Sequence, residues 1–156
     1  MITIGIDPGL KGAIAALDDT GSVLLLEDLP VMRDKSLAWI DGSALQSLLM
    51  GRACGVGHEA VALVERVSSM PGQGVATSFQ FGVGFGSILG VLQAMHIRIE
   101  FVTPAVWKRS YGLGSDKRAS LHRARLTFPN AELQLAKHDG RAEALLIAEY
   151  GRRLIR

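Results

Sequence analysis

Four carboxylates in this 156-residue sequence stand where predicted strands or helices begin or end. Asp7 ends the apolar run ITIGID, and Glu65 ends the run AVALVE. Asp139 and Glu143 lie four residues apart in DGRAEALLIAEY, a spacing that places both on one helical face. Sites in open sheets lie at the carboxyl ends of strands, so Asp7 and Glu65 share a site if their strands are neighbours.

Grouped carboxylates repel one another, and divalent cations relieve that repulsion. Hard oxygen ligands suit Mg²⁺, which commonly binds one or two carboxylates together with a substrate phosphate. Each residue also has an ordinary structural explanation. Asp7 before Pro-Gly fits a turn, Glu65 a surface strand end and Asp139 a helix cap, while Glu143 can pair with Arg141. The four together, in a chain with a basic second half, favour a metal site.

The net charge of +2 conceals an asymmetry along the chain. Residues 1–65 carry a net −5, and residues 66–156 a net +7. The basic excess is concentrated between Pro104 and Phe128, where the cationic residues are Lys108, Arg109, Lys117, Arg118, Arg123 and Arg125. This pattern indicates either a polyanionic partner or a solvated helical face.

The composition, 48% apolar and 21% charged, is typical of one folded domain, and we expect it to span residues 1–156. The single cysteine, Cys54, excludes an intramolecular disulfide and a cysteine-based zinc site. The first residues lack a basic segment followed by an apolar one, so we expect a cytoplasmic protein.

The elements that must position the carboxylates follow from the hydrophobic patterns. The strand pattern recurs at residues 2–7, 12–18, 22–29, 60–65 and 97–102, the first three as an antiparallel meander. Helices are predicted at residues 43–55, 75–95, 104–111, 116–127 and 139–153, with 75–95 buried and 30–41 irregular. Strand, helix and strand over residues 60–102 imply a parallel pair. We therefore predict an α/β fold with a mixed five-stranded sheet flanked by helices.

No charged residue occurs between Val67 and Ile97. Polar residues recur in this stretch and strand-like runs flank it, so we expect no membrane span. The glycines of its helix, Gly82, Gly86 and Gly90, are spaced by four, with Phe85 beside them. Such a smooth stripe suits either close packing on the chain's own sheet or a two-fold interface with a second copy.

Four motifs in order carry a family resemblance: IGIDPGLKG, VALVERV, GLGSDK and HDGRAEALLIAEY. Together they resemble the RuvC family of Holliday-junction resolvases, most of all its compact phage and prophage-type members. The motif GIDPG alone also opens sugar kinases and actin-like ATPases. Those proteins need a second phosphate-binding half that this chain lacks, so we expect no nucleotide cofactor.

The resemblance implies an RNase H-like fold, a homodimer and a nuclease that binds two Mg²⁺ ions, with Mn²⁺ as a substitute. The expected substrate is branched DNA, above all four-way junctions, cut by paired symmetric nicks that leave 5′ phosphates in a bacterial or phage-infected cell. Carried over to this sequence, the metal ligands and catalytic acids are Asp7, Glu65, Asp139 and Glu143. The remaining implied residues are catalytic Lys117, DNA-binding Lys108, Arg109, Lys117, Arg118, Arg123 and Arg125, and the interface Gly82, Phe85, Gly86 and Gly90.

The sequence also departs from the family pattern. The family spaces its acidic helix pair three apart, whereas Asp139 and Glu143 are four apart, and His138 does not match a histidine that some members use. The family's base-stacking aromatic is replaced here by Ser68, which suggests relaxed sequence preference. Trp107 beside Lys108 is a candidate DNA contact. A branched-DNA-binding protein without cleavage and an RNA-directed nuclease of the same fold stay open as alternatives.

Overall fold

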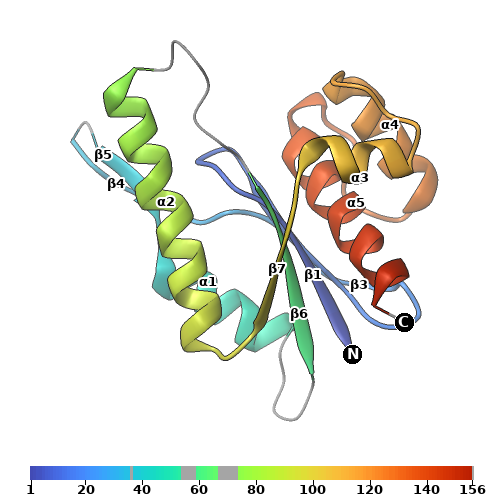
Figure 1. The fold of residues 1–156 in the computed structure, drawn as a ribbon, viewed down its shortest axis with the longest axis horizontal. Helices are drawn as coiled ribbons and strands as arrows, with labels where there is room; N and C mark the ends of the chain where they lie inside the picture. Colours follow the sequence, from blue (N-terminus) through green and yellow to red (C-terminus); the bar gives the residue numbers. More distant parts are fainter. Residues whose placement is uncertain (36, 54–58, 67–73, 156) are drawn as a thin grey trace.

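The computed structural model describes residues 1–35, 37–53, 59–66 and 74–155, with every side chain in these ranges except that of Lys117. Its centre is a five-stranded sheet (Figure 1). The strands are β1 (Ile2–Asp7), β2 (Ala13–Leu17), β3 (Val23–Asp28), β6 (Ala60–Glu65) and β7 (Arg98–Val102). The predicted mixed five-stranded sheet is therefore confirmed.

The strand order is β3-β2-β1-β6-β7. Strands β1, β2 and β3 form an antiparallel meander, whereas β6 runs parallel to β1 and β7 parallel to β6. Parallel neighbours need a crossover, and here the helix between β6 and β7 provides it. The carboxyl ends of β1, β6 and β7 consequently lie along one edge of the sheet.

Helices cover both faces of the sheet (Figure 1). One face carries α1 (Gly42–Leu48), which continues into a π-helical turn (Leu49–Ala53), and α2 (Val75–Ala94). The other face carries α3 (Pro104–Ser110), α4 (Lys117–Thr127), a 3₁₀ turn (Ala136–His138) and α5 (Asp139–Leu154). Thr103 precedes Pro104 at the start of α3, and the Asp116 carboxylate caps α4 by accepting from the Arg118 N–H at 2.9 Å.

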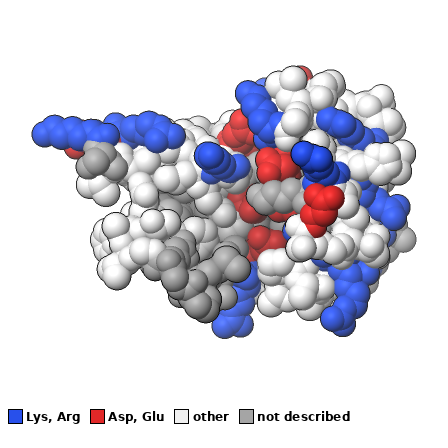
Figure 2. Space-filling model, turned by 90° about the horizontal axis from the view of Figure 1, so that it is seen from above, with Lys and Arg blue, Asp and Glu red and all other residues white. Residues whose placement is uncertain are grey.

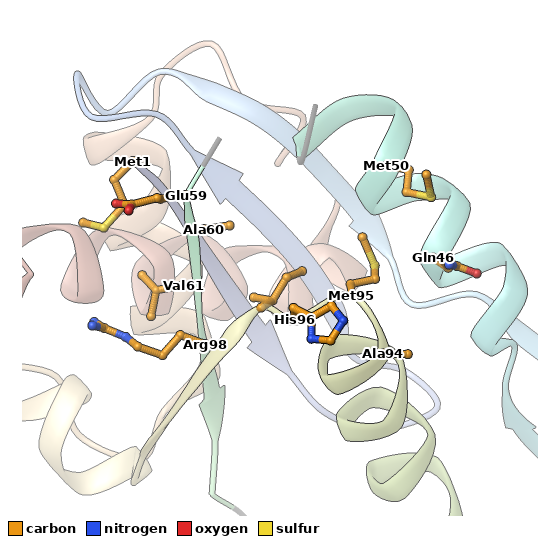
Figure 3. A pocket seen from close by; sticks show the side chains of 11 residues that line it. Met1, Gln46, Met50, Glu59, Ala60, Val61, Ala94, Met95, His96 and Arg98 are labelled. Atoms are coloured by element: carbon orange, nitrogen blue, oxygen red, sulfur yellow. The ribbon is translucent and has the colours of Figure 1, made fainter. Parts of the chain in front are cut away.

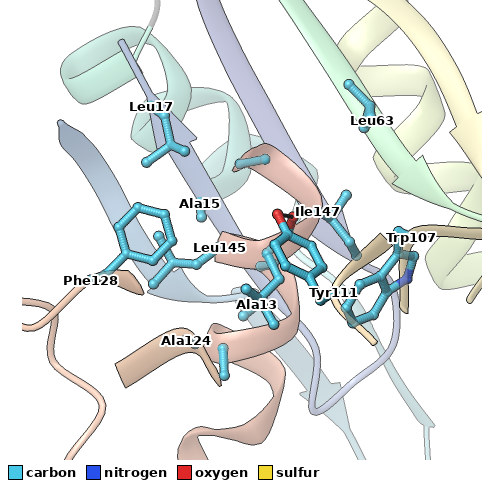
Figure 4. Close-up of a cluster of buried hydrophobic side chains, with 14 of the residues drawn as sticks. Ala13, Ala15, Leu17, Leu63, Trp107, Tyr111, Ala124, Phe128, Leu145 and Ile147 are labelled. Atoms are coloured by element: carbon cyan, nitrogen blue, oxygen red, sulfur yellow. Dashed lines mark hydrogen bonds between the residues drawn. The ribbon is translucent and has the colours of Figure 1, made fainter. Parts of the chain in front are cut away.

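Helix α5 lies directly on β1 because β1 contains a glycine at the crossing. A Cβ atom at Gly5 would collide with the Ala144 carbonyl oxygen and the Ala148 nitrogen. Around this contact, residues of β2, α3, α4 and α5 form one buried cluster, whose side chains include Leu17, Trp107, Tyr111, Phe128 and Leu145 (Figure 4). This packing fixes the first turn of α5 beside the carboxyl end of β1.

The prediction that residues 30–41 are irregular is wrong. Val31–Asp34 (β4) and Leu37–Ile40 (β5) form a separate antiparallel hairpin. Lys35 lies at its tip with φ 49°, in the left-handed region that glycine or asparagine usually occupies. Because a lysine stands there instead, the sequence does not mark this turn. The Gln80 side chain of α2 donates to the Ala38 carbonyl oxygen at 3.0 Å, which attaches the hairpin to that helix.

Residues 75–95 do form the predicted helix, α2, but the prediction that it is buried is wrong. Of the residues of α2, only Gly84, Ile88 and Leu92 are buried. Phe79 is 67% exposed, although it belongs to the most apolar stretch of the chain. High apolarity without charge therefore reflects a surface that the chain's own sheet does not cover.

The glycine stripe of α2 lies on this uncovered side. A Cβ atom at Gly82, Gly86 or Gly90 would meet nothing within 4 Å, so the stripe does not pack on the chain's own sheet. Within the described ranges, α2 is also the one helix that is long and apolar enough to cross a membrane by length and composition.

Candidate active site

Asp7 and Glu65 end two neighbouring parallel strands. The register pairs Ile6 of β1 with Val64 of β6, so the two carboxylates occupy the next position on each strand. Glu65 is 6% exposed and Asp7 is half-buried. The sequence-based expectation that these residues lie side by side at one edge of the sheet is met by this register.

The start of α5 abuts Asp7. A Cβ atom at Gly140 would lie 3.3 Å from Asp7 Oδ2 and 2.9 Å from the Lys11 carbonyl oxygen, so no larger side chain fits there. In the resembled family the two acidic residues of the helix are three apart, so the partner of Glu143 would stand at position 140. Here that position is a glycine. Asp139, one residue earlier, is half-buried in the first turn of α5, and Glu143 is 3% exposed one turn later. The tight contact at Gly140 gives a physical reason for the four-residue spacing.

Helix α3 links the two elements that carry Glu65 and Glu143. Lys108 Nζ lies 2.8 Å from Glu143 Oε1, and the Ser120 hydroxyl of α4 donates to the same oxygen at 3.2 Å. Trp107 Nε1 donates to Glu65 Oε1 at 2.7 Å. Two consecutive residues of α3 therefore bind carboxylates from β6 and α5, which brings the acidic residues of the two elements to one place.

The hypothesis that Trp107 contacts DNA is wrong, because its side chain is fully buried. Sequence reasoning also missed Ser120 and Gly140. Ser120 lies on the buried side of α4 with Leu121 and Ala124, so only its apolar neighbours could have indicated it, and Gly140 carries no signal besides its place inside a helix. Ser68, which stands where the resembled family has its base-stacking aromatic, lies outside the described residues.

Basic and acidic side chains gather on one face of the molecule. Figure 2 shows acidic side chains at the centre of the face at which β1, β6 and β7 end, with Lys and Arg side chains around them. Arg109 and Arg118 are exposed, and Lys117 is the first residue of α4. Arg123 donates to the Tyr111 carbonyl at 3.2 Å, and Arg125 donates to the carbonyls of residues 133 and 134 at 2.8 and 3.0 Å.

The donor chemistry of the four carboxylates fits a hard divalent cation. Among the described residues, no three Asp, Glu, His or Cys side chains are already arranged to hold a metal. The ammonium of Lys108 supplies positive charge at Glu143, and the indole N–H of Trp107 binds Glu65. A cation would bind by moving Lys108 from its position or by using the other carboxylate oxygens.

His138 immediately precedes Asp139 and is 8% exposed. Its Nδ1 is the one buried side-chain nitrogen or oxygen in the described part of the chain without a hydrogen-bond partner. As the residue before α5, it caps the helix with no side-chain hydrogen bond.

A hollow lies at the other end of the strands, away from the four carboxylates (Figure 3). Its volume is about 660 Å³, and its lining includes Met1, Met50, Met95, His96 and Arg98. Glu59 is its single carboxylate, so this hollow lacks the acidic group that defines the candidate site.

No protein-family model and no curated protein matches this sequence. Two solved structures of RuvC from Thermus thermophilus are similar to it over 99% of this chain and 96% of theirs, each at 16% sequence identity. The structure of RuvC in complex with a Holliday junction substrate gives a TM-score of 0.67, and a second RuvC structure gives 0.60. The chain therefore has an RNase H-like fold. More particularly, this fold is that of RuvC, as the resemblance of the motifs predicted.

Proposed function

We propose that the chain is a metal-dependent endonuclease that nicks branched DNA, with four-way junctions as its main substrate. One observation carries the proposal: carboxylates from β1, β6 and α5 converge at the carboxyl ends of parallel strands, with basic side chains around them. The similarity in fold to RuvC in complex with a Holliday junction substrate supports the same class of substrate. Mg²⁺, with Mn²⁺ as a substitute, is the cofactor that such a donor set favours.

Hydrolysis of a phosphodiester needs an activated water and positive charge near phosphorus. Two bound divalent cations would lower the pKa of the water and stabilise the leaving 3′ oxygen. The task of the chain is to present Asp7, Glu65 and the acidic pair of α5 from rigid elements. Lys108, once released from Glu143, and Lys117 would neutralise charge on the scissile phosphate. The products would be nicks with 5′ phosphates.

The exposed arginines of α3 and α4 suit contact with the DNA backbone. Arg109 and Arg118 are exposed, and Arg123 and Arg125 are exposed even though each also binds backbone carbonyls. Arginines that contact phosphates position a duplex without reading its sequence. Binding would therefore recognise the branch rather than the bases and would weaken steeply with salt.

We further propose that two copies associate through α2, because resolving a four-way junction takes two cuts and a two-fold dimer supplies two sites. The open glycine stripe would let a second backbone approach closely. The ring centres of Phe81 and Phe85 on α2 are 6.1 Å apart, and those of Phe85 and Phe101 on β7 are 6.2 Å apart. These three rings extend the apolar surface from α2 to β7. Val83, 41% exposed on α2, lies on the surface available to a partner.

Light scattering of the purified protein tests the dimer. The wild type should have twice the mass of the chain, and Val83→Glu should reduce it to one chain because a charge would be buried in the interface. Asn130→Asp, at an exposed position after α4 on the other face of the sheet, is the matched control and should stay dimeric. A monomeric wild type at micromolar concentration would refute the interface.

Cleavage is tested with end-labelled four-way, three-way and linear duplex DNA in Mg²⁺, Mn²⁺ or EDTA. Paired symmetric nicks in the four-way junction, lost with EDTA and in Asp7→Asn, are the expected result. Asp34→Asn, an exposed carboxylate at the β4–β5 hairpin, is the matched control and should cleave normally. Equal cutting of all branched forms would indicate a broader debranching nuclease.

Two outcomes would refute the proposed activity. Tight binding to the junction without cleavage in any metal would leave a DNA-binding protein. Cleavage of RNA strands in place of DNA would assign the site to an RNA-directed nuclease.

A further inference from the structure

The indole of Trp107 joins the hydrophobic core to an acidic residue of the site. Its ring is fully buried in the cluster beneath α5 (Figure 4). Its one polar atom, Nε1, donates to Glu65 Oε1 at 2.7 Å. An apolar ring would fill the same space in the core, so the N–H of Trp107 has a role besides packing: it binds the Glu65 carboxylate.

The backbone beneath this hydrogen bond is short and rigid. Strand β7 pairs with β6 so that Val102 is the register partner of Glu65, and the Arg66 N–H donates to the Val102 carbonyl at 2.7 Å. Helix α3 begins two residues later at Pro104, whose fixed φ suits the first helical position. Trp107 is therefore carried by a segment that is itself hydrogen-bonded to the end of the strand bearing Glu65.

The chemistry of the pair favours a single orientation of the carboxylate. An indole N–H can only donate, and a hydrogen bond from a neutral donor to an ionised carboxylate is stronger than one between neutral groups. Because the ring is locked by packing, the N–H fixes the position of Oε1 rather than following it. This hydrogen bond restricts rotation about the terminal bonds of the glutamate.

We propose that Trp107 is a positioning residue: its indole N–H holds Glu65 in the orientation in which the carboxylate binds a divalent cation. This inference rests on the proposed function, since it assigns Glu65 to the metal. It also gives α3 a double role, because the next residue, Lys108, binds Glu143 and lies 5.1 Å above the Trp107 ring. Outer partners of metal ligands typically change metal affinity or activity 10- to 100-fold when removed.

The test removes the N–H while keeping the ring. The chain has two tryptophans, so the Trp39→Phe protein leaves Trp107 as the only one. In that protein, Trp107 is replaced biosynthetically by benzothienylalanine, which has the same two-ring shape with sulfur in place of N–H. The readout is the concentration of free Mn²⁺ measured by electron paramagnetic resonance. We expect the dissociation constant for Mn²⁺ to rise at least ~10-fold.

A matched control separates positioning from stability. Tyr111 belongs to the same cluster, and its buried hydroxyl donates to the Leu146 backbone carbonyl at 2.9 Å rather than to a carboxylate of the site. Tyr111→Phe also removes one buried donor from this core, so it should lower the melting temperature without changing the affinity for Mn²⁺. An equal loss of Mn²⁺ affinity in Tyr111→Phe and in the sulfur analogue would assign Trp107 a merely structural role.

A spectroscopic measurement tests the contact without any DNA. In the Trp39→Phe protein, one indole N–H proton resonance is expected, and it should shift on titration with Mg²⁺ and in Glu65→Gln. A resonance that moves in neither case would overturn the proposal.

The outcomes also distinguish this inference from the proposed activity. If the sulfur analogue binds Mn²⁺ as tightly as the parent while junctions are still cleaved, the positioning role is refuted and the nuclease stands. If the analogue loses Mn²⁺ affinity but the parent cleaves no branched DNA, the positioning role stands and the nuclease is refuted.

Discussion

Replacing Lys108 with methionine should reveal the electrostatic cost of the acidic group. The side chains of Lys108 and Glu143 are 13% and 5% exposed, and their charged atoms are 2.8 Å apart. Methionine keeps an unbranched apolar stem of similar length, so the packing changes little. What disappears is the positive charge beside a buried carboxylate.

The size of the effect follows from this burial. Breaking a fully buried ion pair by removing one partner costs about 3–5 kcal/mol. The remaining exposure of Lys108 and the hydrogen bond from Ser120 to the same oxygen reduce that cost. We expect Lys108→Met to lower the free energy of unfolding by about 2–3 kcal/mol. The melting temperature should fall by roughly 4–12 °C for a chain of this length.

Urea unfolding in EDTA and in Mg²⁺ measures the effect. In EDTA the full loss should appear. In Mg²⁺ part of it should be recovered, because a cation can take the place of the missing ammonium, and a ligand at 100 times its dissociation constant stabilises by about 2.7 kcal/mol. Lys137→Met, at an exposed position before α5, is the control and should change stability by less than about 0.5 kcal/mol.

A double-mutant cycle provides the refuting result. In a Glu143→Gln background there is no carboxylate charge to balance, so Lys108→Met should cost far less than in the wild type. If Lys108→Met is equally costly in both backgrounds, the ion pair does not account for the loss and the electrostatic reasoning fails.

Three further predictions concern the same region and the end of α5. Gly140→Ala should lower the free energy of unfolding by about 1–3 kcal/mol and reduce nicking, because its Cβ would push against Asp7 and the Lys11 carbonyl; thermal unfolding and the junction assay check this. Burial disfavours the charged form of Glu149, but hydrogen bonds from Arg152 and Arg153 outweigh it and lower its pKa, so this carboxylate stabilises the fold above its ordinary pKa of 4.5. That contribution should be lost as the pH falls through the lowered pKa, and the stability gap between wild type and Glu149→Gln should close in acid urea titrations. Finally, EDTA should abolish nicking while leaving the wild type folded, because Lys108, Ser120 and Trp107 bind the carboxylates of the site without a cation; calorimetry in EDTA should still show a cooperative unfolding transition.

Each of these has a contrary result. Unchanged stability in Gly140→Ala would mean that α5 moves away from β1 without cost. A gap between wild type and Glu149→Gln that stays constant from neutral to acid pH would exclude ionised Glu149 as its source. Unfolding of the protein by EDTA would show that the acidic group needs a cation to fold.

Local patterns were sufficient for the main elements of the fold. The apolar runs ending at Asp7 and Glu65 predict β1 and β6, because each is short, rich in branched residues and followed by a polar residue. Helix α5 was predictable from its apolar face and its acidic start. The placement of the carboxylates then follows from the parallel pairing of β1 and β6, which the sequence left as a condition, since it implied a parallel pair only for β6 and β7.

Features that depend on distant contacts were not predictable. The hairpin of β4 and β5 turns at Lys35 with a positive φ, which the ordinary turn residues do not mark. The exposure of α2 is equally hidden, since an apolar helix reads the same whether its own sheet or another chain covers it. The role of Trp107 depends on the register of β6 with β7 and on where α3 begins, and no local pattern encodes either.

The contacts of α3 explain how an acidic group can persist in a folded chain before any cation binds. Glu143 is buried, and a buried carboxylate without a partner would be strongly destabilising. Lys108 supplies the charge at Glu143, and Trp107 supplies a donor at Glu65, both from one helical turn. Because Lys108 is positively charged and the indole of Trp107 is neutral, a bound cation would affect the two contacts differently. The ammonium would compete with a divalent cation for Glu143, whereas the neutral indole would not repel the cation and could keep its hydrogen bond. In the proposed nuclease, Lys108 would therefore be the residue that turns toward a phosphate, and Trp107 the one that holds Glu65 in place.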